Sequence, residues 1–139
     1  PVDAAADAAN ARRTVYGLVD RQNLPGLYRA FDFAAPDQCV ERRPRTTVPQ
    51  QALFAMNSPF AMEQARALAG LVQAMGVAED RDWVRGLFRR VLVRDPMEWE
   101  LERALRFVQG TEAAGAGDFG PWEQLAQVLL ASNEAVFLD

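Results

Sequence analysis

Lysine, histidine and isoleucine are absent from this chain of 139 residues, and cysteine occurs only once, at position 39. Without histidine, and with a single thiol, the chain alone cannot assemble the usual zinc, haem or Ser-His-Asp arrangements. Cys39 has no partner for an intrachain disulfide and no nearby base to activate it, so we interpret it as a semi-buried loop cysteine. The sequence therefore predicts no catalytic residue, no metal ligand and no cofactor-binding residue.

All fifteen basic residues are arginines, which a GC-rich genome explains without any function. The chain also has nineteen acidic residues, and its net charge of −4 argues against nucleic-acid binding, because phosphate contacts need a basic face. The charge is uneven: residues 1–60 carry seven arginines and six acids, whereas residues 61–139 carry eight arginines and thirteen acids. We interpret the acidic second half as a solvated helical surface.

Long apolar runs are also missing. Half of the residues are apolar, but no segment approaches the roughly 20 apolar residues that a membrane span requires. The length suits one core that buries roughly 68% of the unfolded surface. We expect a linker or the tail of a preceding segment at residues 1–11 and a single domain at 12–139, with a signature half (12–76) and a helical half (77–139). Because the first residue is proline, we expect a piece excised from a longer chain.

Hydrophobic spacing predicts helices along most of the domain. Thr47 is a suitable N-cap, Pro49 fits the first helical turn, and Asn57-Ser58-Pro59 then interrupts the pattern, with Ser58 able to cap a second helix that stops near Gly76. The apolar stripe of the first helix comprises Val48, Ala52, Leu53 and Met56. The stripe of the second comprises Ala61, Met62, Ala65, Leu68, Ala69, Val72 and Met75.

Three further helices follow. Asp82 is expected to cap a helix over 83–94, and Asp95 to cap the next one, with Pro96 at its first position and Glu98 at its third. A Gly/Ala loop is predicted over 110–120, and Pro121 opens the last helix. The residues expected to be buried are Val84, Leu87, Phe88, Val91, Met97, Leu101, Ala104, Leu105, Val108, Trp122, Leu125, Ala126 and Leu129. The prediction is an all-α fold, a compact bundle of about five to six amphipathic helices with an extended N-terminal arm around residues 14–19.

Several segments, in the same order, resemble one protein family. They are Arg12–Tyr16, Asp20–Leu27, Phe31–Phe33, Thr46–Phe60, Glu63–Ala69 and, more weakly, Leu87–Pro96 and Leu129–Phe137. Together they resemble the planctomycete-specific C-terminal domain of unknown function, the PSD-one domain. One departure is Val93-Arg94-Asp95-Pro96, where the resemblance implies a Gly-Arg-Pro-like corner. It also implies an exported parent protein, periplasmic or on the cell surface, which often carries a cytochrome-c-like domain, so that any haem lies elsewhere in the parent.

Two polar clusters are candidates for a binding site. Arg42, Arg43 and Arg45, with Gln50 close in sequence, could hold an anion or an acidic glycan, because arginine binds carboxylates and phosphates through two parallel hydrogen bonds. The alternative is a loop tied to the acids or helix ends of its own domain. The second cluster is polar and aromatic and contains Arg13, Tyr16, Arg21 and Asn23. It suits sugar contacts or, as the alternative that we favour, a structural network.

Three other features have structural explanations. Glu98 and Glu102 lie on one helix face like a carboxylate pair, but Arg106 is placed to pair with Glu102. Trp99 lies off the apolar stripe, and we expect it to be partly exposed and stacked on Arg103. Trp83 and Trp122 are expected to anchor helix packing.

Two functions fit these observations. The first is a non-catalytic structural or interaction module, whose partners are neighbouring domains of the same polypeptide. The second is a contribution of the Arg42–Arg45 loop to a carbohydrate- or anion-binding site shared with a neighbouring domain, which could belong to a polysaccharide-degrading protein. Whether the parent protein is an enzyme does not follow from the sequence.

Overall fold

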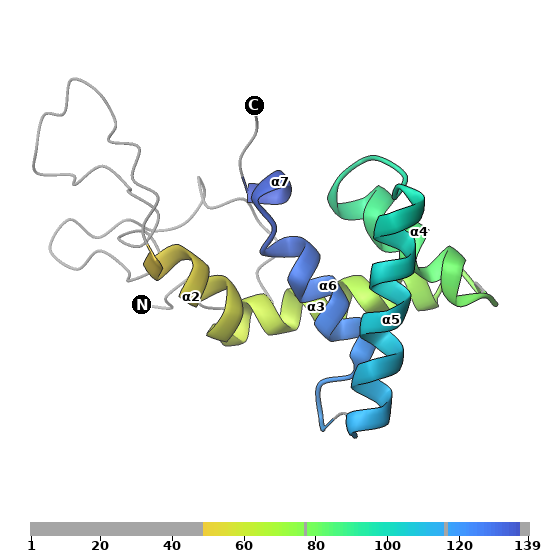
Figure 1. Cartoon of the computed structure of the whole chain (residues 1–139). Helices are drawn as coiled ribbons and strands as arrows, with labels where there is room; N and C mark the ends of the chain where they lie inside the picture. The colour runs from red at the N-terminus through yellow and green to blue at the C-terminus, as the bar shows by residue number, and fades with distance from the viewer. Residues whose placement is uncertain (1–48, 77, 116, 137–139) are drawn as a thin grey trace, which may run out of the picture.

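The computed structural model describes residues 49–76, 78–115 and 117–136 (Figure 1). These residues form six helices and no strand, which confirms the predicted all-α class. The predicted N-terminal arm and Thr47 lie outside the described residues. The helices are α2 (Pro49–Asn57), α3 (Pro59–Gln73), α4 (Asp80–Val91), α5 (Glu98–Ala114), α6 (Pro121–Leu130) and α7 (Asn133–Val136).

Helix α6 is the element around which the others are arranged, because it contacts every other described helix. It packs along α3, which runs across the molecule in Figure 1, while α4 packs against α3, α5 and α6, and α5 packs against α4 and α6. Helix α2 precedes α3 and contacts both α3 and α6, and the short α7 lies at the end of α6. In Figure 1, α2 and α7 lie at the same end of the described body.

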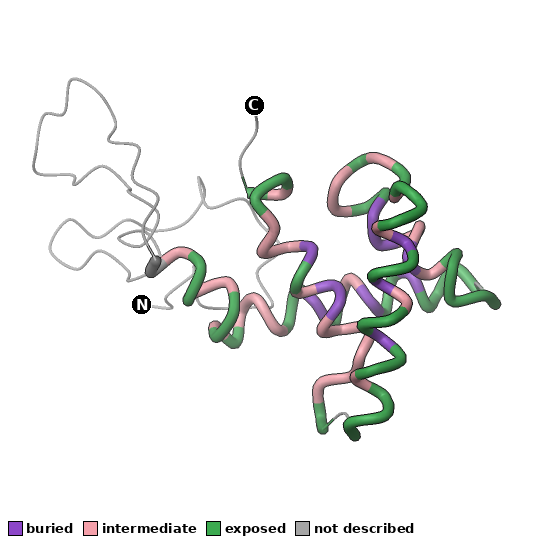
Figure 2. The backbone as a smooth tube through the Cα atoms, in the orientation of Figure 1, coloured by how far each residue is buried: buried purple, intermediate pink, exposed green. Residues whose placement is uncertain are grey.

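The core consists of apolar side chains from α3, α4, α5 and α6, on the sides of these helices that face one another (Figure 2). Among the described residues, no polar or charged residue is buried. Trp83 of α4 and Trp122 of α6 pack at the edge of this core with ring centroids 5.0 Å apart, as anchors of helix packing should. The buried residues are Ala65, Ala69, Val72, Val84, Leu87, Phe88, Leu101, Ala104, Val108, Leu125, Ala126 and Leu129.

The corner between α2 and α3 confirms the capping prediction. The hydroxyl of Ser58 accepts a hydrogen bond from the Ala61 amide at 3.1 Å, and Pro59 occupies the first turn of α3. Asn57 closes α2, since its side-chain amide donates to the Leu53 carbonyl at 3.0 Å. Gly76 has a φ of +67° just beyond the end of α3, which confirms it as the helix stop.

A close approach of α3 and α4 depends on Gly86. A Cβ atom placed there would lie 3.0 Å from Cγ1 of Val72, which is itself completely buried. The glycine therefore lets the α4 backbone pack directly on a core side chain of α3, where even an alanine would be tight.

Several predicted helix ends were wrong. Helix α4 starts at Asp80 with Glu79 as its N-cap, so Asp82 is not the cap. Helix α5 starts at Glu98 with Met97 as N-cap, because Asp95 is bound instead by an arginine, as described below. The predicted loop over 110–120 was too long at its start, since α5 continues to Ala114 and leaves only a short connection before Pro121.

The predicted apolar faces were correct for the centre of the bundle and wrong at its periphery. Met75 and Met97 were expected to be buried and are exposed, and Leu105 is only half-buried at the edge of the core. In α2 the stripe members Ala52, Leu53 and Met56 all face outward. Periodicity thus located the apolar faces of these segments without showing which of them meet the core.

Candidate functional site

Most of the predicted binding residues lie outside the described part of the chain. This applies to the whole polar and aromatic cluster and to the three arginines of the other cluster. These residues are Arg13, Tyr16, Arg21, Asn23, Arg42, Arg43 and Arg45. Gln50 lies in α2, but its side chain is outside what is described. Both predicted clusters therefore remain predictions.

The corner between α4 and α5 is built on an unusual backbone conformation. Val93 directly follows the C-cap residue Leu92 and has a φ of +57°, the left-handed region that glycine adopts most easily. This is the corner at which the sequence resemblance implied a glycine. The valine keeps the glycine-like turn, and its side chain is 87% exposed, so no packing contact offsets the backbone strain.

Replacing this residue with glycine should therefore stabilise the domain. A left-handed conformation costs an L-residue roughly 1–2 kcal/mol, and glycine at position 93 would remove this strain. Part of the resulting gain in stability is lost, because glycine has greater conformational freedom in the unfolded chain. We expect Val93→Gly to raise the free energy of unfolding by about 1 kcal/mol, measured by urea denaturation. Val93→Ala is the matched control, because alanine retains the Cβ atom and should gain little. A destabilised Val93→Gly variant would contradict this assignment of strain.

The turn at Val93 places Arg94 at the centre of a polar cluster that joins three parts of the chain. Its guanidinium donates to both oxygens of Glu100 at 2.7 Å. It also donates to both oxygens of Glu134, at 2.6 and 2.8 Å. The Arg94 guanidinium carbon lies 5.6 Å from the centre of the Phe88 ring. One side chain thus joins the end of α4, the start of α5 and the helix α7.

The charges of this cluster stabilise one another. Hydrogen bonds with the two carboxylates raise the pKa of Arg94 above its usual value, and the same bonds lower the pKa values of Glu100 and Glu134. Glu100, whose side chain is only 13% exposed, also accepts the Met97 amide at 2.7 Å and so caps α5. Because all these groups are paired within the domain, the cluster is suited to holding elements together rather than to acid–base chemistry.

A second ion pair supports the same corner. Arg89 of α4 donates to both carboxylate oxygens of Asp95, at 2.5 and 3.1 Å, and this bond lowers the pKa of Asp95. Sequence reasoning missed both clusters. The six-residue spacing of Arg94 and Glu100 across a predicted corner was an available signal, but Glu134 is 40 residues away and had none.

The carboxylate pair considered from the sequence does not form a free acid–base pair. Glu98 is bound by Arg81 at 2.5 Å, and Arg106 lies 3.5 Å from Glu102, as predicted. Arg103 lies over the ring of Trp99 at 6.0 Å, and Trp99 is exposed, which confirms the predicted stacking. Within the described residues, no group of three or more His, Cys, Asp and Glu residues is placed to hold a metal ion.

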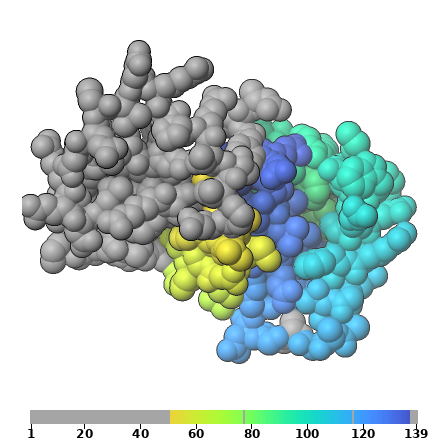
Figure 3. Space-filling view, turned by 60° about the vertical axis from the view of Figure 1, so that its left-hand side comes forward, coloured from red at the N-terminus to blue at the C-terminus, as the bar shows by residue number. Residues whose placement is uncertain are grey.

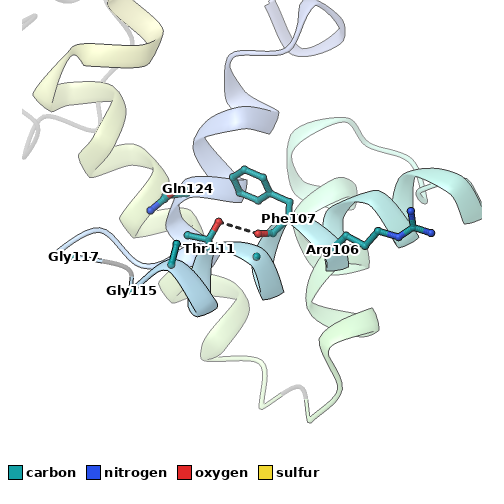
Figure 4. Close-up of a pocket in the computed structure, with 8 residues that line it drawn as sticks. Arg106, Phe107, Thr111, Gly115, Gly117 and Gln124 are labelled. Atoms are coloured by element: carbon teal, nitrogen blue, oxygen red, sulfur yellow. Dashed lines mark hydrogen bonds between the residues drawn. The ribbon is translucent and has the colours of Figure 1, made fainter.

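An open hollow lies between the end of α5 and α6 (Figure 4). Two of its polar side chains are bonded to nearby backbone carbonyls: Thr111 donates to the Phe107 carbonyl of α5 at 2.8 Å, and Gln124 of α6 donates to the Phe119 carbonyl of the preceding connection at 2.9 Å. It therefore presents few free polar groups to a ligand. The lining residues are Arg106, Phe107, Gly110, Thr111, Ala114, Gly115, Gly117 and Gln124.

Comparison with protein-family models gives a match over most of the chain. A model of the PSD1 family, described as a protein of unknown function (DUF1553), matches residues 2–108. No curated protein and no solved structure matches the chain. The match does not include residues 129–137, so the resemblance of that segment to a closing helix of the family remains a prediction. None of the described helices is both long and apolar enough to cross a membrane. Since the matched region is most of the chain, this protein belongs to the PSD1 family of unknown function.

Proposed function

We propose that this domain is a non-catalytic structural or interaction module of a larger exported planctomycete protein, and that neighbouring domains of the same polypeptide are its partners. The observation that carries the proposal is the outer face of α3. Apolar residues recur along this face at intervals of four: Ala67 and Leu71 of α3, and then Met75, two residues beyond the end of the helix. All three are exposed. Such a row suits contact with another protein surface better than contact with water.

The other face of α3 is already used. It buries Ala65, Ala69 and Val72 in the core, so the helix is apolar on two sides. Helices with apolar residues around most of their circumference are typically buried on more than one side. A domain docked on the outer face would give α3 that environment. Arg90, whose Nη2 lies 3.3 Å from the Met75 sulfur, supplies a charged edge to the same surface.

Hydrogen exchange tests this proposal. Amides of residues 64–76 should exchange more slowly in the parent polypeptide than in this chain alone, because docking suppresses the openings that permit exchange. A Leu71→Glu/Met75→Glu variant of the parent should lose that added protection. Val128→Glu, an equally polar change at an exposed site on α6, is the matched control and should leave it intact. Equal exchange in the parent and in the isolated chain would refute docking on this face.

The alternative proposal is a shared carbohydrate- or anion-binding site formed with Arg42, Arg43 and Arg45. Its support is the use already made of the described arginines. Six of these eight form ion pairs with acids of the domain. Arginine in this domain is thus a residue that binds carboxylates, and three arginines within four positions of the sequence suit an anionic ligand.

A thermal-shift screen against neutral, acidic and sulfated oligosaccharides tests this alternative. A ligand at a hundredfold excess over its dissociation constant stabilises the native state by about 2.7 kcal/mol. We expect a shift with anionic glycans only, and its loss in an Arg42→Ala/Arg43→Ala/Arg45→Ala variant. A shift that survives in the triple variant, or none with a cooperatively folded sample, would reject the arginine loop as the site.

A further inference from the structure

Gly110 is a glycine in the interior of α5 whose position no contact within the described residues explains. Glycine inside a helix lowers stability relative to alanine, because it loses more conformational freedom on folding. Gly86 has a reason, since a Cβ atom there would lie 3.0 Å from Cγ1 of Val72, and Gly70 lies on the outer face of α3 that is proposed above to dock a partner. A Cβ atom at Gly110 would meet nothing within 4 Å, and this residue lines the hollow between α5 and α6. A bare backbone at such a place allows a ligand to pack directly against the helix.

Aromatic rings and arginines lie along the same side of α5. Arg103 comes four residues after Trp99, and it precedes Arg106 and Phe107 by three and four residues. Residues at these spacings are neighbours on the surface of a helix. All four are exposed, and the Arg103 guanidinium lies over the Trp99 ring at 6.0 Å. Two guanidinium groups and two rings thus lie on one side of α5, which leads to Gly110 one turn further on.

The acids of the domain leave these two arginines largely available. Among the described residues, no acid forms an ion pair with Arg103. Arg106 reaches Glu102 only at 3.5 Å, and its side chain is 80% exposed. Like charges one helical turn apart destabilise a helix, and an anion bound between them would offset that repulsion. Since arginine binds carboxylates through two parallel hydrogen bonds, this side of α5 favours a carboxylate.

The hollow next to these arginines suits the uncharged part of a small molecule. Its volume is about 520 Å³, and small-molecule sites in proteins measure roughly 300–1,000 Å³. It opens between α5 and α6, whose surfaces lie side by side in Figure 3. Phe107 supplies an apolar wall, while Thr111 and Gln124 are already bonded to backbone carbonyls. Arg106 lies at the rim on the side away from Gln124 (Figure 4), so the charged group of a ligand would lie at the rim and its apolar part inside.

We propose that this side of α5 is a binding site for a small organic acid in which a carboxylate is attached to a ring. The carboxylate is held by Arg103 and Arg106, and the ring packs on Phe107 and on the backbone at Gly110. Trp99 positions Arg103 through the cation–π contact. A long polyanion fits less well, because a chain with a net charge of −4 would repel the parts that extend beyond the site. The inference does not depend on the proposed function, because it uses neither the outer face of α3 nor the arginine loop.

A titration followed by amide NMR tests the proposal on the whole chain. The probes are sodium benzoate and sodium glucuronate, since a ring carboxylate can be an aromatic acid or a sugar acid. Benzyl alcohol and glucose are their uncharged counterparts. We expect amides of residues 103–114 to shift saturably with at least one acid, and the acid that binds more tightly identifies the kind of ring. No shift with either acid, or an equal shift with its uncharged counterpart, would refute the site.

Variants of the arginines test the role of the charge. Arg103→Ala/Arg106→Ala should raise the dissociation constant of the acid at least about tenfold, because the ligand loses its charge-assisted hydrogen bonds. Arg85→Ala/Arg90→Ala removes the same charge from α4, so it is the matched control and should leave the dissociation constant unchanged. Unchanged affinity in Arg103→Ala/Arg106→Ala, with loss of binding in the triple variant of the arginine loop instead, would assign the carboxylate to that loop and overturn the proposal.

Gly110→Ala separates a ligand site from an unused hollow, because stability and binding should change in opposite directions. Alanine has the higher helix propensity and its Cβ atom would meet nothing within 4 Å, so the melting temperature should rise by about 2–6 °C. The added methyl group takes the place of the ring, so binding of the acid should weaken at least about fivefold. A lower melting temperature, or binding as tight as in the wild type, would contradict the role given to Gly110 and overturn the proposal.

Discussion

Leu87→Ala is expected to lower the free energy of unfolding by about 2–5 kcal/mol. Leu87 lies in the middle of α4, is completely buried, and belongs to the core that joins α3, α4, α5 and α6. Truncation removes apolar contacts and leaves a cavity, because close-packed neighbours relax only in part. The measurement is urea denaturation at pH 7, followed by circular dichroism at 222 nm.

Val128→Ala is the control for this result. Val128 is more than half exposed on α6, and substitutions at such positions usually change stability by no more than about 0.5 kcal/mol. The loss of unfolding free energy in Leu105→Ala should lie between those of Leu87→Ala and Val128→Ala, since Leu105 packs on the edge of the core and is only half-buried. A loss below about 1 kcal/mol for Leu87→Ala would mean that the core is not centred on this face of α4.

Capping and turn residues were sufficient to predict those helix ends that depend only on residues nearby in sequence. Ser58 with Pro59, Gly76 and Pro121 act on the backbone within a few positions, so the start and end of α3 and the start of α6 could be predicted from sequence. The start of α5 could not. Asp95 and Glu100 both offer a carboxylate to this corner, and their tertiary partners Arg89 and Arg94 decide which one caps the helix.

Tertiary contacts also explain the faces that sequence alone did not resolve. The apolar stripes of α2 and α3 have correct helical spacing, but spacing does not state which surface covers a stripe. The same limit applies to the site. The pairing of Arg94 with Glu134 joins residues 40 apart through the packing of α7, and no local pattern encodes that separation. The Arg13–Asn23 and Arg42–Arg45 clusters lie outside the described residues and remain sequence predictions.

Arg94→Ala is the second change expected to have a large effect. It removes the ion pairs with Glu100 and Glu134, each of which has two hydrogen bonds, and the contact with the Phe88 ring. It also leaves the carboxylate of Glu100, whose side chain is only 13% exposed, without its cation. Hydrogen bonds to charged groups contribute about 1.5–3 kcal/mol each, but Arg94 is itself 33% exposed, and solvent reduces that value. We expect a net loss of about 1–3 kcal/mol at pH 7, together with faster hydrogen exchange in α7.

The dependence of this loss on pH separates the ion pairs from simple packing. The folded-state pKa values of Glu100 and Glu134 lie below their ordinary value of 4.5, because Arg94 stabilises the ionised forms. Their stabilising contribution is therefore complete above the unfolded pKa and is lost as the pH falls through the folded values. Arg94 remains charged throughout this range. The difference in unfolding free energy between wild type and Arg94→Ala should thus be full at pH 7 and shrink as the pH is lowered below about 4.

Arg106→Ala provides the matched control for the charge. Arg106 is 80% exposed and lies 3.5 Å from Glu102, so its removal should change stability little at any pH. If the loss in Arg94→Ala were the same at pH 7 and pH 3, the contact of Arg94 with Phe88 and its aliphatic packing would account for the effect. The other outcome is that this difference in unfolding free energy disappears at low pH, while the α7 amides of the wild type begin to exchange with solvent. In that case the pairing of Arg94 with Glu134 is what holds α7 on the bundle.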